Sequence, residues 1–364
     1  MNSSTSNSDL HRYYVQRLCA LALIPFCGLF SLAVYLEPLW GDLTRIGSYA
    51  EREFGWNRTQ LEFPKPLSTL GRYDRYHDVV VLGDSFSTGR PNLHWQNYLV
   101  TATSWSVVTL DINNIAVNQV LANRVFRETP PKFVIVESAE RALTGRIEDE
   151  PPCAATALPQ LGGKGPLRPA AITPPRRQGP IEGTAKHVER KTAWSDIQPT
   201  YVLSYLQNSF LRIVVGDAHT SAAKVELSRS APFSSANNHA MLVYKDDFRK
   251  VQWWREMGVR EIGCRVERMR SQVEANGITR FVFMVAPDKL TTYADFLKDE
   301  GLRGISSLAE LSAHHAEVMP RLDLALISAI RQGEQDVYLP NDTHWGSSGY
   351  RIATETLLQF LAMP

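Results

Sequence analysis

The sequence lacks the patterns that mark metal-binding and nucleic-acid-binding proteins. It contains only four cysteines, and neither a Cys-x-x-Cys pair nor a His/Cys cluster with zinc-ligand spacing occurs. Without such a ligand set we expect no metal and no other cofactor. The formal net charge is only +1 and no long basic run is present, which argues against a protein that binds nucleic acid. No internal repeat is evident.

One long apolar run is present instead. Residues 18–36, LCALALIPFCGLFSLAVYL, carry no charge, with Arg12 and Arg17 before them and Glu37 after them. A helix of this length rises about 28 Å, close to the thickness of the hydrocarbon core of a bilayer. We therefore predict a transmembrane signal anchor at 18–36. Because the basic flank precedes the run, residues 1–17 form a cytoplasmic tail and the rest lies outside the cytoplasm. The alternative is a cleaved signal peptide, which has a shorter apolar stretch and an Ala-x-Ala site.

The four cysteines fall into two kinds. Cys19 and Cys27 lie inside the apolar run, where inert packing is expected. Cys153 and Cys264 would lie in an oxidising compartment, where they can form a disulfide. Two cysteines in separate contexts leave a disulfide and two free thiols both open.

The pattern of apolar residues predicts the fold. Residues 37–72 show no sustained period and are interpreted as a stalk or linker. Strands are then predicted at 78–82, 105–112, 130–138 and 279–287, and helices at 114–128, 260–277 and 346–362. Continuous apolar runs such as DVVVL are typical of parallel strands buried on both faces. This alternation predicts an α/β domain at 73–364, with a doubly wound parallel sheet flanked by helices. Residues 144–245 are rich in Pro and Gly and are interpreted as an insertion that is at least partly loop.

A serine follows the first predicted strand, in VVVLGDSFSTG at 79–89. In an open α/β sheet, the turns at the carboxyl ends of the strands carry the functional sites. Ser85 would project from such a turn, and backbone N–H groups at the start of the next helix could stabilise an oxyanion. A helix N-cap serine gives the same pattern. The motif alone therefore leaves a nucleophile and an N-cap both open.

A nucleophilic serine needs a general base, and the base needs an orienting carboxylate. Of the nine histidines, His344 in YLPNDTHWGSSGY is the strongest candidate, because it lies in a loop before the last predicted helix. Asp342 precedes it by two residues, and residues two apart in an extended segment point to the same side. Asp342 can thus hold the imidazole while His344 faces Ser85. The alternatives are an N-cap role for Asp342 and simple packing for His344.

Four short blocks add a family resemblance. They are LGDSFS (82–87), PKFVIVESAER (131–141), VAPDKLTTYADFL (285–297) and NDTHWGSSGY (341–350). Together they resemble SGNH (GDSL-like) hydrolases and acyltransferases, and within these the periplasmic alginate O-acetyltransferase branch of bacteria. The resemblance implies an SGNH-like fold, with Ser85 as the nucleophile that becomes acetylated, His344 as general base and then acid, and Asp342 as the group that orients His344. It also implies that the Ser85 N–H contributes to the oxyanion hole.

Two features depart from that branch. Its Asp-x-His block precedes the serine block, whereas here Ser85 comes first and His344 last, the order of general SGNH hydrolases. The triad can survive this rotation because it is defined by geometry and not by chain order. The oxyanion Gly and Asn blocks are not recognisable: Asn113 and Asn114 stand where the Gly is expected, and Arg141 ends the stretch where the Asn is expected.

Four residues are therefore secondary candidates for oxyanion or substrate binding: Asn113, Asn114, Arg141 and Trp345. Arg141 either lies near the site or forms a structural ion pair with Glu137. Trp345 forms either an apolar wall or sugar platform, or part of the core. Among other aromatic residues, Trp95, Trp253 and Trp254 could stack on sugar rings or belong to the core.

The resemblance also implies a function. We expect a single-pass protein of the bacterial inner membrane whose periplasmic domain transfers acetyl groups to a hydroxyl of a polysaccharide or cell-envelope glycan. Acetyl-CoA is cytoplasmic, so related systems use a multi-pass membrane O-acyltransferase as the acetyl supplier, and such a partner is expected here. An SGNH-type carbohydrate esterase is an alternative, because it shares every step as far as the acyl-enzyme. A non-catalytic envelope scaffold with the same fold is the second alternative.

Overall fold

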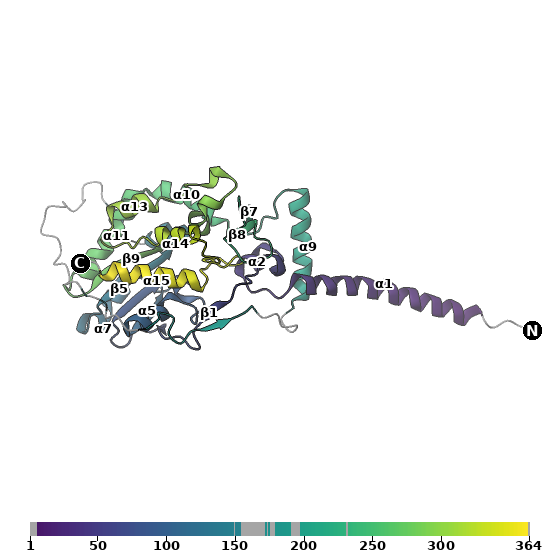
Figure 1. Ribbon diagram of the computed structural model, residues 1–364, viewed down its shortest axis with the longest axis horizontal. Helices are drawn as coiled ribbons and strands as arrows, with labels where there is room; N and C mark the ends of the chain where they lie inside the picture. Colours follow the sequence, from purple (N-terminus) through teal and green to yellow (C-terminus); the bar gives the residue numbers. More distant parts are fainter. Residues whose placement is uncertain are drawn as a thin grey trace, which may run out of the picture.

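A parallel five-stranded sheet lies at the centre of the molecule, with helices on both faces (Figure 1). The computed structural model describes residues 6–148, 150–153, 172, 174, 179–190, 197–230 and 232–362. The strand order is β2-β4-β3-β5-β9, and all neighbours run parallel. The strands are β2 (Thr69–Leu70), β3 (Val79–Gly83), β4 (Val107–Asp111), β5 (Phe133–Ala139) and β9 (Arg280–Ala286). The predicted α/β class with a parallel sheet flanked by helices is confirmed.

The continuous apolar runs feed two separate cores. In β3, Val79 and Val81 face one hydrophobic cluster, whereas Val80 and Leu82 face another on the opposite side of the sheet. Successive side chains of a strand point to opposite faces, so a strand covered on both sides is apolar on both, as β3 is. The first cluster contains residues of α5 (Trp95–Thr103), α14 (Leu322–Arg331) and α15 (Ser347–Ala362). The second contains residues of α6 (Val117–Ala122), α7 (Arg124–Glu128), α11 (Val259–Glu274) and α13 (Leu308–His314).

Most predicted elements are present with small changes at their ends. The helix expected at 114–128 is divided into α6 and α7 at Asn123, whose side chain accepts a hydrogen bond from the N–H of Val125 and starts a new helix. The remaining short elements are α2 (Asp42–Gly47), α3 (Glu51–Phe54), α4 (Ser85–Thr88), α8 (Leu143–Ile147), α10 (Asp246–Met257), α12 (Lys289–Thr292) and the 3-10 turns Glu140–Ala142, Ala294–Phe296 and Glu300–Leu302.

A long apolar helix projects from the domain. Helix α1 (Ser6–Leu36) extends away from the rest of the molecule in Figure 1, and its segment from Leu10 to Leu36 is long and apolar enough to cross a membrane. Most of that segment is exposed, as expected for a helix whose surroundings are lipid. Pro25 lies inside the helix without ending it.

Residues 37–72 differ from the expected stalk, because they pack against the end of the chain. Leu43 and Phe54 are fully buried, and the N–H of Leu43 donates to the carbonyl of Asn341 at 3.1 Å. Glu51 is buried too, and its carboxylate accepts hydrogen bonds from Thr44 and Asn341. The stretch shows no sequence period because its elements are only two to six residues long. Burial without regular spacing looks like a linker in the sequence.

The insertion at 144–245 contains more regular structure than a loop. It holds a long helix, α9 (Pro199–Val214), and an antiparallel pair, β7 (Ala222–Glu226) with β8 (Ala240–Tyr244). A second pair joins β6 (Lys186–Val188) to β1 (Gln60–Glu62). Cys153 and Cys264 form a disulfide that ties the start of the insertion to α11.

Candidate active site

The sequence-predicted site residues lie at one edge of the sheet. Ser85 follows β3, Asn113 follows β4, Arg141 follows β5 and Asp288 follows β9. The strands are parallel, so these positions share the carboxyl edge where open α/β sheets place their sites.

Backbone and carboxylate hydrogen bonds hold the serine turn. Asp84 is the N-cap of α4, with Oδ1 accepting from the N–H of Phe86 at 3.0 Å and Oδ2 accepting from the N–H of Ala139 at 2.7 Å. Asp84 is thus structural, and it fixes the turn to the end of the neighbouring strand. Among the described residues, the N–H of Ser85 has no hydrogen-bond acceptor. It remains available to a ligand, as an oxyanion donor must be.

A second buried carboxylate supports the turn from below. One oxygen of Glu137 accepts from the N–H of Asp84 at 3.1 Å and from the hydroxyl of Ser87 at 2.7 Å. Burial and then the nearby Asp84 charge raise the pKa of Glu137 well above its ordinary value. A Cβ at Gly83 would lie 2.5 Å from the Ser87 side chain and 2.8 Å from Glu137, so only glycine fits there. Sequence reasoning missed this role of Glu137.

His344 and Asp342 form a tight pair. Nδ1 of His344 lies 2.6 Å from Oδ1 of Asp342, and the His344 backbone N–H donates to the same oxygen at 3.0 Å. Oδ2 of Asp342 accepts from Arg90 at 2.8 Å. Although burial opposes the charged form, the His344 and Arg90 cations hold the pKa of Asp342 below its ordinary value. Burial also lowers the pKa of His344, but the Asp342 carboxylate outweighs it and the net pKa is raised.

A third carboxylate comes from the segment interpreted as a stalk. Asp42 accepts from the N–H of Thr343 at 2.9 Å and from its hydroxyl at 2.6 Å. Its Oδ2 lies 3.9 Å from Nδ1 of His344. Burial and then the Asp342 charge raise the pKa of Asp42. No sequence signal pointed to Asp42, because it lies about 300 positions from the loop that it contacts.

Ser85 and His344 line the same cavity. Its volume is about 1170 Å³, and its walls include Asp42, Asn113, Arg141 and Trp253. Nε2 of His344 is buried and has no hydrogen-bond partner among the described residues, so Ser85 does not yet donate to it in this state. The rings of Phe86 and His344 are 5.0 Å apart, which places the serine turn beside the imidazole. Catalytic hydrogen bonds are often long before substrate binds, and this geometry is compatible with a serine–histidine pair.

A second histidine nearby does not compete for the role of base. His94 is fully buried, and its Nε2 accepts a hydrogen bond from the N–H of Arg90 at 2.8 Å. Burial, and then the charge of His344, lower the pKa of His94 to about 3. It is therefore a neutral acceptor that fixes the backbone of Arg90.

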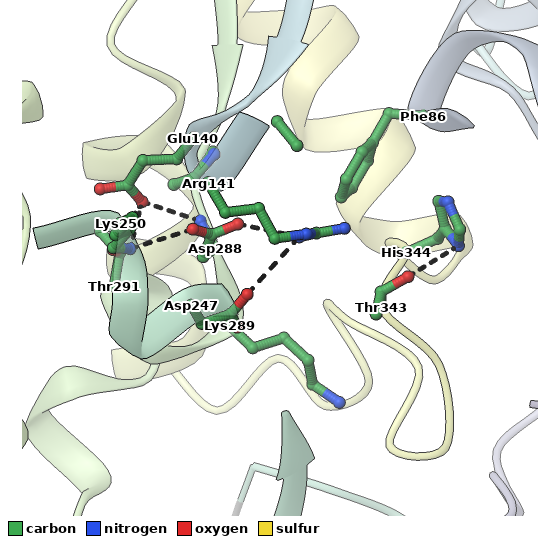
Figure 2. Close-up of polar contacts among 12 residues, drawn as sticks. Phe86, Glu140, Arg141, Asp247, Lys250, Asp288, Lys289, Thr291, Thr343 and His344 are labelled. Atoms are coloured by element: carbon green, nitrogen blue, oxygen red, sulfur yellow. Dashed lines mark hydrogen bonds and ion pairs between the residues drawn. The ribbon is translucent and has the colours of Figure 1, made fainter. Parts of the chain in front are cut away.

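Arg141 connects the cavity to a buried charge cluster behind it. Its guanidinium donates to Asp288 at 2.9 Å and lies 3.6 Å from Asp247. Figure 2 shows the Arg141 side chain extending from these carboxylates toward His344. Lys250 completes the cluster, with its ammonium 2.8 Å from Glu140 and 3.1 Å from Asp288. The alternative ion pair between Arg141 and Glu137 is not formed.

Lys289 supports the loop that carries Asp342. Its ammonium is almost completely buried and donates to three backbone carbonyls, those of Leu339, Pro340 and Asp342, at 3.0–3.1 Å. Burial outweighs the nearby carboxylates and lowers the pKa of Lys289 to about 8. The residue belongs to the VAPDK block, but sequence reasoning gave it no role.

The secondary candidates for oxyanion or substrate binding lie in different places. Asn113 lines the cavity, and its side chain donates to Asp111 at 2.6 Å. Asn114 is exposed and donates to the same carboxylate, so it braces the turn and is not part of the cavity wall. Trp345 is fully buried against Phe86 and Tyr350, so of its two alternatives the core position is the one found.

One group of side chains has the spacing of metal ligands. One ligand atom each from Asp42, Asp342 and His344 lies within 4.8 Å of the others. All three groups already have partners: Nδ1 of His344 binds Asp342, the Arg90 guanidinium contacts Asp342, and Asp42 accepts from Thr343. A metal cation bound here would be repelled by the nearby positive charge of Arg90. The arrangement fits an oriented histidine better than a metal centre.

We compared the chain with protein-family models, with curated proteins and with solved structures, and found no match in any of the three.

Proposed function

We propose that this protein is a serine-dependent O-acyltransferase anchored in a bacterial inner membrane, with an SGNH-type active site in the periplasm. The observation that carries the proposal is the pairing of Asp342 and His344 at 2.6 Å, with His344 and Ser85 lining the same cavity. Segments far apart in the sequence supply a nucleophile, a base and an orienting carboxylate to one site. That is the minimum needed for acyl-enzyme chemistry.

The chemistry follows from these positions. Ser85 Oγ gives its proton to Nε2 of His344 and attacks the acyl carbonyl carbon of the donor. The Ser85 N–H stabilises the negative oxygen that forms, and Asp342 stabilises the imidazolium. His344 then protonates the leaving oxygen of the donor, which leaves an acetyl ester on Ser85. An acceptor hydroxyl gives its proton to His344 and attacks that ester, and the proton returns to Ser85 as the product leaves.

Features of the cavity favour a glycan as the acceptor. Trp253 and Tyr244 lie in its wall and offer rings on which a sugar could stack. Arg141 and Asn113 provide donors for hydroxyl or carbonyl oxygens. A multi-pass membrane O-acyltransferase is proposed as the acetyl supplier. A carbohydrate esterase would use the same residues with water as acceptor.

The test uses the full chain in detergent, incubated with p-nitrophenyl acetate and measured by intact mass. We expect one acetyl group on the wild type and on Ser271→Ala, which alters an exposed serine of α11, and none on Ser85→Ala. Added xylo- or manno-oligosaccharides would then accept the acetyl group if the protein is a transferase, whereas free acetate alone would indicate an esterase. A folded wild-type protein with neither adduct nor ester turnover would contradict the proposal and favour the scaffold.

A further inference from the structure

Helix α9 (Pro199–Val214) carries an unusual set of exposed apolar side chains. Leu203, Phe210 and Ile213 are 62%, 62% and 84% exposed, and Leu206 and Val214 are exposed as well. Positions 203, 206, 210, 213 and 214 follow the spacing of one helical face, so they form a continuous stripe. We call these five residues the α9 stripe. No other described residues cover it.

The opposite face of α9 is fastened to the protein. Tyr201 and Val202 are buried in a small cluster with Ala33 and Leu36, which belong to the last turn of α1. The hydroxyl of Tyr201 donates to the carbonyls of Thr44 and Tyr49, at 2.5 Å and 2.9 Å. The helix therefore cannot rotate to bury its stripe without breaking these contacts.

Additional hydrogen bonds fix the C-terminal half of the helix. Arg212 donates to the carbonyls of Gly47 and Ser48, and Asn208 donates to the Ser48 hydroxyl at 2.8 Å. These partners lie at the end of α2, so α9 is held by both α1 and α2.

The orientation of α9 relates the stripe to a membrane. In Figure 1, α9 runs across the direction of α1, at the side of the domain from which α1 projects. If α1 spans a bilayer, a helix lying across its last turn runs along the bilayer surface. Helices with one apolar face bind membrane interfaces in this orientation.

Exposed aromatic residues lie near both ends of α1. Tyr35 and Trp40 are both about two-fifths exposed beside the end of α1, and Tyr13 and Tyr14 are exposed near its start. The 22 positions from Tyr13 to Tyr35 correspond to a rise of about 33 Å, close to the thickness of a hydrocarbon core. Tyr and Trp are enriched at both membrane interfaces. The outer aromatic level coincides with the contact between α1 and α9.

We propose that α9 is an interfacial helix whose stripe inserts into the outer face of the bilayer that α1 spans. Lipid is the occupant because the stripe continues the apolar, lipid-exposed surface of α1 and both surfaces lack protein partners among the described residues. The opposite face of the helix holds the end of α2, and the first residue of α2 is Asp42 in the active-site wall. Asp42 lies six positions after Leu36, a span of at most about 20 Å.

The consequence for catalysis rests on the function proposed above. A cavity held this close to the bilayer can receive an acyl group from a donor embedded in the membrane, without release of that group into solution. The contact between α9 and lipid does not itself depend on Ser85 chemistry.

The experiment places the photo-crosslinking residue p-benzoylphenylalanine at Ile213 in the full chain, reconstituted in vesicles of phosphatidylcholine and phosphatidylglycerol. The control carries it at Ile278, another isoleucine, 54% exposed, which lies just before β9 and away from α1. We expect lipid adducts at position 213 at least ten times as abundant as at 278, and unchanged in the Ser85→Ala background. A repeat at Phe210, whose ring resembles the probe, guards against misfolding, and the Cys153–Cys264 disulfide reports the fold of each variant.

Two results would overturn the proposal: equal lipid adducts at positions 213 and 278, or adducts of 213 only with a second copy of the chain. Ile213→Asp adds a functional readout, because it should slow transfer from a membrane-held donor at least fivefold and leave turnover of p-nitrophenyl acetate unchanged. Loss of both activities would point to misfolding or to a role of α9 in the site itself. Lipid adducts without any acyl-enzyme would contradict the proposed function and leave the interfacial helix standing.

Discussion

Asp42 should control the pH at which His344 works. Its carboxylate lies 3.9 Å from Nδ1 of His344, and it adds to the effect of Asp342 in favouring the imidazolium. A general base must be neutral to act, so a negative neighbour moves the acid limb of the pH–rate profile to higher pH. Asp42→Asn removes this charge and keeps side-chain atoms able to bond Thr343. The acid limb should therefore move to lower pH.

The size of the shift follows from distance and exposure. Two unit charges 3.9 Å apart interact by about 1 kcal/mol in water and by about 4 kcal/mol at an effective dielectric constant of 20. The side chains of His344 and Asp42 are 20% and 27% exposed, and both line the cavity, so solvent screens the pair and the lower figure is the better guide. One pH unit corresponds to about 1.4 kcal/mol. We expect a shift of about one unit.

The assay is the pH dependence of kcat/KM for p-nitrophenyl acetate, which reports the pKa of the base in the free enzyme. Thr343→Val is the matched control, because it removes the hydroxyl bonded to Asp42 and leaves the Asp42 charge in place. An unchanged acid limb in Asp42→Asn, or an equal shift in Thr343→Val, would refute the electrostatic argument. A uniform loss of rate at all pH values would show that Asp42 acts only on the loop conformation.

Three further predictions concern stability, measured by urea unfolding. Lys250→Met should lower the free energy of unfolding by about 3–5 kcal/mol, because Glu140 and its neighbours would lose the cation that compensates them; an unchanged midpoint would contradict this. The pKa of Lys289 is lowered to about 8 in the folded protein, against an ordinary value of 10.5. Between these two pH values the unfolded chain binds more protons than the folded protein, so the free energy of unfolding should rise with pH. The rise should be roughly 3 kcal/mol larger in the wild type than in Lys289→Met. The same pH dependence of the free energy of unfolding in wild type and Lys289→Met would contradict this prediction. Cys264→Ser should lower the free energy of unfolding by roughly 4 kcal/mol, because the Cys153–Cys264 disulfide closes a sequence separation of 111 residues. A reductant should lower the free energy of unfolding of the wild type by a similar amount and leave that of the variant unchanged.

Periodicity was enough to predict four of the five strands of the sheet and helices on both of its faces. Most of the buried strands contain a run of apolar residues, such as VVVL in β3 and FVIV in β5, and this signal survives any arrangement of the surrounding loops. The serine turn and the Asp342–His344 pair were also accessible, because each depends on neighbours within a few residues. Both depend on local backbone geometry, which a short sequence motif can specify.

The remaining parts of the site depend on distant contacts. Asp42 and Arg90 reach the Asp342–His344 loop only through tertiary folding, and neither lies in a periodic segment. Trp345 was open between core and sugar platform, because a tryptophan after a histidine is compatible with both until its neighbours are known. The insertion was interpreted as partly loop because its proline-rich stretch obscured α9 and the β7–β8 pair. Long-range packing, rather than local preference, decided each of these.

The contact between Gly41–Asp42 and Asn341–Thr343 affects when the site can form during synthesis of the chain. These two segments are about 300 positions apart, yet each supplies a wall of the same cavity. If the protein is exported N-terminus first, as the proposed function requires, Asp42 and Ser85 emerge early and His344 only after some 250 more residues have crossed. During that interval the proposed nucleophile would have no base. On that proposal, completion of export would be needed before the site can react.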